Sequence, residues 1–124
     1  MKRNELEERL IEFSVSCIGI SRKMMDDKVG VHIMGQIIRS STSCALNYGE
    51  AQSGESKRDF IHKMKIVLKE LRESYVCLRI ILRSNLTDQK DKVEKAIEEA
   101  NELISIFVKS ISTAQSRLHN NPAK

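Results

Sequence analysis

The sequence predicts an all-α protein, an antiparallel up-down-up-down left-handed four-helix bundle formed by one domain, residues 1–124. Three observations predict this fold. The single proline, Pro122, lies near the end of the sequence and all five glycines lie in its first half, so long helices meet almost no breakers. Apolar residues recur at alternating steps of three and four, the period of a bundle seam. Short turn signals separate four such stretches, and short connections place successive helices antiparallel.

The first helix is expected at residues 5–27. Asn4, followed by acidic residues, is a suitable N-cap. The apolar seam of this helix consists of Leu6, Leu10, Phe13, Cys17, Ile20 and Met24. A turn near Asp27 to Gly30 then leads into the second helix, expected at residues 31–51.

The third and fourth helices are expected at residues 57–83 and 88–118. Ser56, with an acidic residue three positions later, resembles a capping box, and Thr87 can cap the fourth helix. Each of these helices carries one continuous apolar face with the same spacing. We expect the tail, residues 119–124, to be frayed.

A polar row runs along the otherwise apolar second helix. At 100° per residue its members fall within about one third of the helix circumference. They are Gln36, Arg39, Ser40, Ser43, Asn47 and Glu50. Because Arg39 is the only charged residue from Val29 to Tyr48, we expect this helix to be largely buried and its polar row to be hydrogen-bonded internally.

The expected partner of Arg39 is Glu50 on the same helix or Glu70 on the third helix. The predicted buried polar network comprises Gln36, Arg39, Ser43, Asn47, Glu50 and Glu70. Two interpretations remain open: a core network that fixes the register of the helices, or a row that contacts a ligand or partner.

The third helix carries most of the basic charge. The net charge is +4, and residues 57–83 hold eight Lys or Arg against three acidic residues. Seven basic or His side chains fall within about 100° of one another on the outer face of this helix. They are Arg58, His62, Lys65, Lys69, Arg72, Arg79 and Arg83.

Such a basic row can follow the phosphates of a nucleic acid, or it can be the solvated face of an amphipathic helix. Mixed signs are usual on a face that serves solubility alone, and acids are scarce on this one. Because Tyr48 and Tyr75 lie on or near apolar faces, we expect any binding to depend on charge and shape, without base stacking.

No recognised catalytic or metal-binding pattern is present in the sequence. It contains no Glu-x-x-His pair, no nucleophile with a recognisable base, and no glycine-rich phosphate loop. We therefore expect no enzyme activity, metal, cofactor, small-molecule substrate or membrane association. Cys17, Cys44 and Cys77 lie among apolar helical positions, which predicts reduced core thiols in a cytoplasmic protein.

Several apolar residues remain outside the predicted core seams. They are Ile11, Ile18, Ile66, Ile80 and Ile81. Helices that carry a second apolar stripe need a second partner, so we expect a homo-oligomer.

The segment from Gly35 to Ala51 resembles the signature Gln-x-x-Arg-small-small-x-Ser-x-x-x-Asn-x-x-Glu of the four-helix-bundle proteins encoded in 23S ribosomal RNA intervening sequences. Ser56 and the run from Lys63 to Glu73 also match this family. The resemblance covers roughly residues 11–113 and is most specific in the second and third helices. A more distant similarity links the chain to the accessory variability determinants of diversity-generating retroelements.

The resemblance implies a small bacterial bundle, assembled as a homopentamer, with no assigned enzyme activity. The retroelement group uses a basic pentameric bundle to bind nucleic acid and a reverse transcriptase. The sequence departs from the family pattern at Tyr48-Gly49, where an Ile-Ala pair is common and where glycine lowers helix stability by up to about 1 kcal/mol. We therefore predict a non-enzymatic, homo-oligomeric binding module for structured RNA; the alternative is a protein-binding scaffold with no nucleic-acid role.

Overall fold

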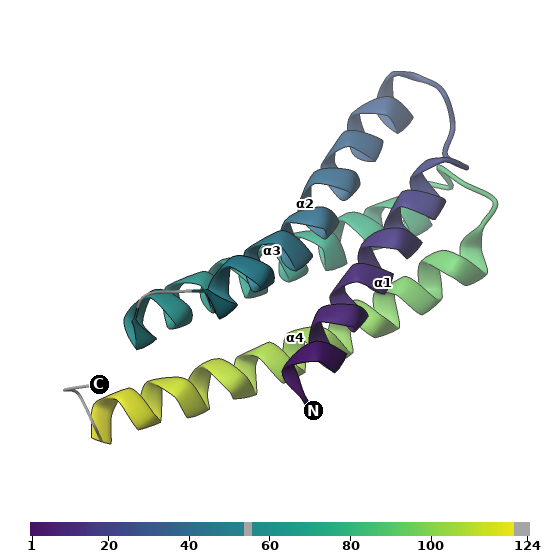
Figure 1. Cartoon of the computed structure of the whole chain (residues 1–124). Coiled ribbons are helices and arrows are strands. Elements are labelled where there is room, and N and C mark those ends of the chain that lie inside the picture. The colour runs from purple at the N-terminus through teal and green to yellow at the C-terminus, as the bar shows by residue number, and fades with distance from the viewer. Residues whose placement is uncertain (54–55, 121–124) are drawn as a thin grey trace.

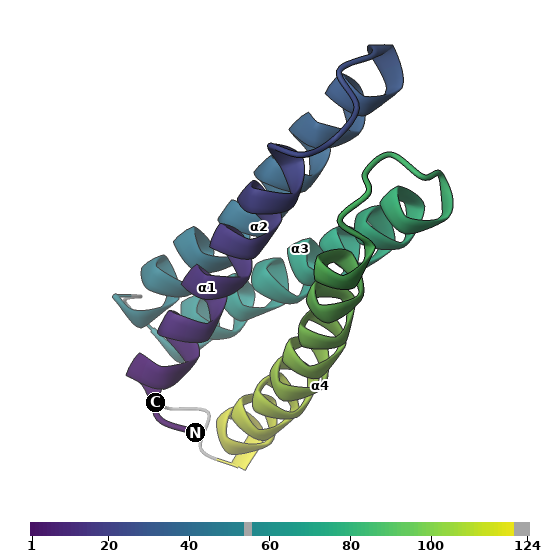
Figure 2. The same cartoon turned by 90° about the vertical axis from the view of Figure 1, so that its right-hand side faces the viewer.

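The computed structural model describes residues 1–53 and 56–120. It contains four helices, which are α1 (Arg3–Ser21), α2 (Lys28–Gln52), α3 (Lys57–Arg83) and α4 (Lys90–Asn120). Successive helices run in opposite directions (Figure 1). The α1–α2 and α3–α4 connections lie together at one end, while the N-terminus and the end of α4 lie at the other (Figures 1 and 2). The predicted all-α, four-helix architecture is confirmed.

All four helices contribute to one core. Phe13 of α1, Ile37 of α2, Leu71 of α3 and Phe107 of α4 have almost no exposed surface. The helix α2 packs along α1 and α3, and α3 along α4, whereas α1 and α4 contact one another less extensively. The three cysteines are free and buried, as the sequence predicted.

The helix α1 differs from its prediction at both ends. It begins at Arg3, so Asn4 is not its N-cap, and it ends at Ser21, well before the predicted residue 27. The reason for the early end is a tertiary contact, since the Met25 N–H donates a hydrogen bond to the Leu86 carbonyl at 2.8 Å. The α1–α2 connection therefore pairs with the α3–α4 connection and leaves the helical path.

Capping side chains set the starts of α2 and α3. The Asp27 carboxylate accepts a hydrogen bond from the Gly30 N–H at 2.7 Å, which starts α2 three residues before the predicted position. A Cβ at Gly30 would lie 1.9 Å from a backbone carbonyl oxygen, so only glycine fits there. The Ser56 hydroxyl accepts from the backbone N–H three residues later at 3.1 Å, and α3 spans the predicted residues 57–83.

The helix α4 begins after Thr87, whose hydroxyl accepts a hydrogen bond from the Gln89 N–H at 3.2 Å and donates one to the Lys23 carbonyl at 2.8 Å. Its first residue, Lys90, lies two positions after the predicted start. The helix continues through Asn120, so residues 119 and 120, which were predicted to belong to the tail, are helical. Residues 121–124 of the predicted tail lie outside the described residues.

Candidate nucleic-acid interface

The outer face of α3 presents its basic row to solvent. Six of the seven side chains are exposed and Arg79 is half-buried, with its guanidinium 5.4 Å from the centre of the Tyr75 ring. None of the seven lies within 4.0 Å of a carboxylate oxygen in the part of the chain that the structure describes. The exposed members are Arg58, His62, Lys65, Lys69, Arg72 and Arg83.

The acidic side chains in the middle of α3 are held on another side of the helix. Glu70 and Glu73 both accept hydrogen bonds from Arg39 of α2, and the Arg39 Nη1 lies 2.9 Å from the Glu70 Oε2. The Glu70 side chain is only 10% exposed, whereas that of Arg39 is 49% exposed. Both carboxylates raise the pKa of Arg39, that of Glu73 most, so this cation stays charged. Because Arg39 binds both acids, the outer row remains uniformly basic.

The polar row of α2 is not the buried network that the sequence predicted. Of its six members, Gln36, Arg39 and Glu50 are exposed, Ser43 and Asn47 are half-buried, and only Ser40 is buried. The prediction is wrong because a helix with few charged residues need not be buried. The helix in fact exposes apolar side chains, among them Val31 at 53% and Leu46 at 68%.

Among the described residues, the predicted network forms only one contact between helices. Arg39 contacts Glu70, one of its two expected partners. Glu50 instead lies 3.5 Å from the Lys63 Nζ on α3. The Asn47 amide donates to the Ser43 carbonyl one turn earlier on its own helix, at 2.9 Å, so this contact does not join two helices.

Serines make the buried polar contacts between helices. The Ser74 hydroxyl of α3 donates to the Ser40 hydroxyl of α2 at 2.8 Å, and the Ser14 hydroxyl of α1 donates to the Ser41 carbonyl at 2.8 Å. All four serines are buried. The contacts of Ser14 and Ser74 were not predicted from the sequence. The available signal was a serine placed among the apolar residues of a helix seam. Because all four serines are buried, these contacts stabilise the helix packing and do not form a binding site.

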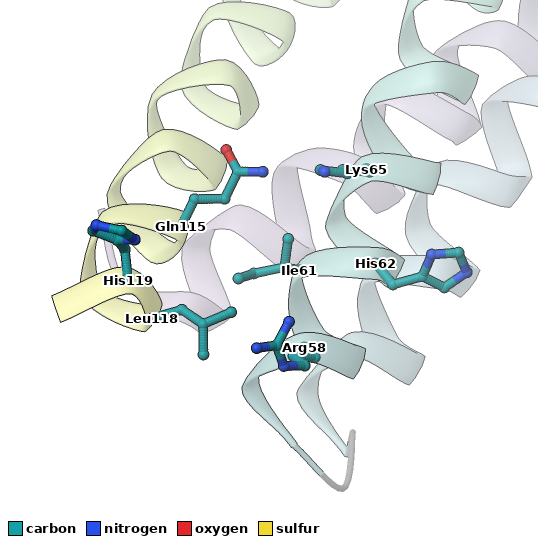
Figure 3. A pocket seen from close by; sticks show the side chains of 7 residues that line it. All are labelled: Arg58, Ile61, His62, Lys65, Gln115, Leu118 and His119. Carbon is teal, nitrogen blue, oxygen red and sulfur yellow. The ribbon is translucent and has the colours of Figure 1, made fainter. Parts of the chain in front are cut away.

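A cavity of about 590 Å³ adjoins one end of the basic row, between the start of α3 and the end of α4. We call it the α3–α4 notch. Its lining residues are Arg58, Ile61, His62, Lys65, Gln115, Leu118 and His119. Figure 3 shows Ile61 and Leu118 facing one another across the gap, with Lys65 and Gln115 extending toward each other beside them. Periodicity alone could not predict the notch, because only the packing of α3 on α4 brings Gln115 and Leu118 to the basic row.

Other kinds of site have little support in the described residues. No group of three His, Cys, Asp or Glu side chains there is placed to hold a metal ion. None of the four helices is long and apolar enough to cross a membrane. Tyr48 is buried and packs edge-on against Phe107, with the ring centroids 5.8 Å apart, so its ring is not available to stack on a base.

Comparison with known proteins agrees with the fold and with the motif on α2. A crystal structure of a protein of unknown function from the S23 ribosomal protein family of Bacteroides thetaiotaomicron is similar, with a TM-score of 0.80, 27% sequence identity, and coverage of 90% of this chain and 99% of that one. No curated protein matches the chain. The sequence profile described as 23S rRNA-intervening sequence protein matches residues 2–109. Because that match includes the whole of α2 and α3, the chain belongs to the 23S rRNA-intervening sequence protein family.

Proposed function

We propose that this protein is a non-enzymatic binding module that holds structured RNA by its phosphate backbone, through the outer face of α3. The observation that carries the proposal is the row of seven basic or His side chains with no carboxylate partner among residues 1–53 and 56–120. A helix rises 1.5 Å per residue, so the row from Arg58 to Arg83 is about 38 Å long. That length can meet several phosphates in succession.

The distribution of charge supports the same surface. The helix α3 holds eight basic and three acidic residues, an excess of five, whereas the whole chain has a net charge of +4. The rest of the chain is therefore slightly acidic. Two of the three acids on α3 pair with Arg39 on the α2 side, which keeps them from opposing a phosphate at the outer row.

The proposal includes a homo-oligomer in the cytoplasm, a pentamer by family resemblance. Exposed apolar side chains on α1 and α2 support assembly, including Val15 at 54% and Leu46 at 68%. Of the candidates from sequence, Ile11 and Ile80 are exposed and Ile18 and Ile66 are half-buried, whereas Ile81 is fully buried and was a wrong candidate. Several copies would present several basic rows and so bind one RNA more tightly than one row does.

A salt titration tests the RNA proposal. For three or four phosphate contacts, raising the salt from about 50 to 200 mM should weaken binding of a structured RNA by about 20- to 150-fold. The triple variant Lys65→Glu, Lys69→Glu and Arg72→Glu should lose binding and keep its helicity, because all three side chains are exposed.

The matched control reverses three exposed lysines on α4, at positions 90, 92 and 95. This control changes the net charge by the same amount and should retain most of the binding. Equal loss in both triple variants would show that net charge, and not the α3 row, determines affinity. No binding by the parent at low salt would favour the protein-binding scaffold instead.

A further inference from the structure

We propose that the α3–α4 notch receives one unpaired nucleotide of the bound RNA, with its base against Ile61 and Leu118 and a flanking phosphate at Arg58 and Lys65. This inference rests on the proposed RNA binding by α3 and adds a specificity site to it. Arg58 and Lys65 belong both to the basic row and to the lining of the notch. An RNA that follows the row therefore reaches the notch without leaving the cationic surface.

The floor of the notch is apolar and separate from the main core. Ile61 is 7% exposed, yet it is not part of the hydrophobic cluster that joins the four helices. Leu118, in the last turn of α4, also lies outside that cluster and is half-buried. The two side chains face one another across the gap (Figure 3). Ile61 therefore forms a nearly covered floor, and Leu118 supplies the more exposed apolar surface of the notch.

The polar groups at the rim match the remaining parts of a nucleotide. Arg58 and Lys65 lie three residues before and four residues after Ile61, on the same side of α3, and supply cations for a phosphate. The Gln115 amide can both donate and accept a hydrogen bond, as the edge of a base requires. None of the described residues that line the notch is acidic, and a second cavity of about 140 Å³ that shares Ile61 adds Lys57 and Arg117.

The size and chemistry of the notch together favour a nucleotide. A volume of about 590 Å³ lies within the range of small-molecule sites and accommodates one nucleotide. Proteins that read RNA bind unstacked bases of loops and bulges on apolar side chains and through their polar edges. Continuity with the basic row favours RNA over an acidic peptide.

The His62 ring points away from the gap and His119 lies on the side of α4 away from α3 (Figure 3), so neither imidazole is assigned a contact.

The test compares two RNA hairpins that are identical except for one bulged nucleotide in the stem. At one fixed salt concentration the parent protein should bind the bulged hairpin about 5- to 10-fold more tightly, as expected when part of a base is buried on apolar side chains. Leu118→Ala should remove this preference and leave the affinity for the plain hairpin unchanged. Gln115→Ala, at an exposed position, should reduce the preference without affecting folding.

Two controls separate the notch from the basic row. Val108→Ala removes another exposed aliphatic side chain of α4 and should keep the preference. Lys69→Ala with Arg72→Ala should weaken binding of both hairpins by the same factor. Equal binding of the two hairpins by the parent, or a preference that survives Leu118→Ala, would contradict the proposed nucleotide site in the notch. The proposed RNA binding by α3 would not be affected. Binding of neither hairpin overturns both proposals.

Discussion

Replacing Arg39 should destabilise the bundle by more than the loss of a surface ion pair and by less than the loss of a buried ion pair. Exposed pairs contribute about 0–1 kcal/mol, and breaking a buried pair costs about 3–5 kcal/mol. Here Glu70 is 10% exposed and Arg39 is 49% exposed, so water screens one end of the pair and leaves the other desolvated. For Arg39→Ala we expect a loss of about 1.5–2.5 kcal/mol in unfolding free energy, mostly because the buried carboxylate loses its partner.

Chemical denaturation at one fixed protein concentration, with a double-mutant cycle, measures this effect. The coupling of Arg39 to Glu70 should be larger than its coupling to Glu73, whose side chain is 43% exposed. Glu70→Gln should be milder than Glu70→Ala, because the amide can still accept from the guanidinium. An unchanged midpoint for Arg39→Ala, or stronger coupling to Glu73, would refute the reasoning from burial.

Two further predictions concern the cysteines and the glycines of α2. Burial raises the pKa of Cys77 from 9.0 to about 11 and that of Cys17 to about 12, so the thiols should resist a disulfide labelling reagent at pH 8 until the protein unfolds. Because unfolded thiols ionise near pH 9 and folded ones do not, the thiol contribution to unfolding free energy should be constant below pH 9 and fall between pH 9 and about 12; rapid labelling of the folded protein would contradict this. Gly30→Ala should lower the unfolding free energy by about 1–3 kcal/mol, since its Cβ would clash with a carbonyl oxygen. Gly35→Ala, where a Cβ meets nothing within 4 Å, should leave the bundle as stable or raise its stability by up to about 1 kcal/mol; equal urea midpoints for the two variants would disprove this contrast.

The helical seams could be predicted well because local periodicity determines them. The bounds of α3 match their prediction, since Ser56 caps its start and a continuous apolar face runs to residue 83. The end of α1 could not be found in this way. Its apolar spacing continues through Met24, which is buried, but the backbone there leaves the helix to pair with the segment before α4. That pairing joins residues far apart in the sequence and has no local signal.

The candidate site was predictable only in part, for a similar reason. The outer position of the basic row follows from helical geometry, because each residue turns 100° and the core face is apolar. The expected burial of the α2 row was wrong, since a helix face with little charge can still be exposed to solvent. The notch could not be predicted, because it forms only where the end of α4 lies beside the start of α3. That placement depends both on the lengths of the two helices and on how they pack.

Lysine footprinting with and without a structured RNA tests the central claim most directly. Acylation of exposed lysines at low salt, followed by mass spectrometry, reports which amines the RNA covers. The account predicts that RNA protects Lys65 and Lys69 on α3 and leaves Lys92 and Lys95 on α4 reactive, all four being exposed in the free chain. Protection of the α4 lysines with Lys65 and Lys69 still reactive would contradict it.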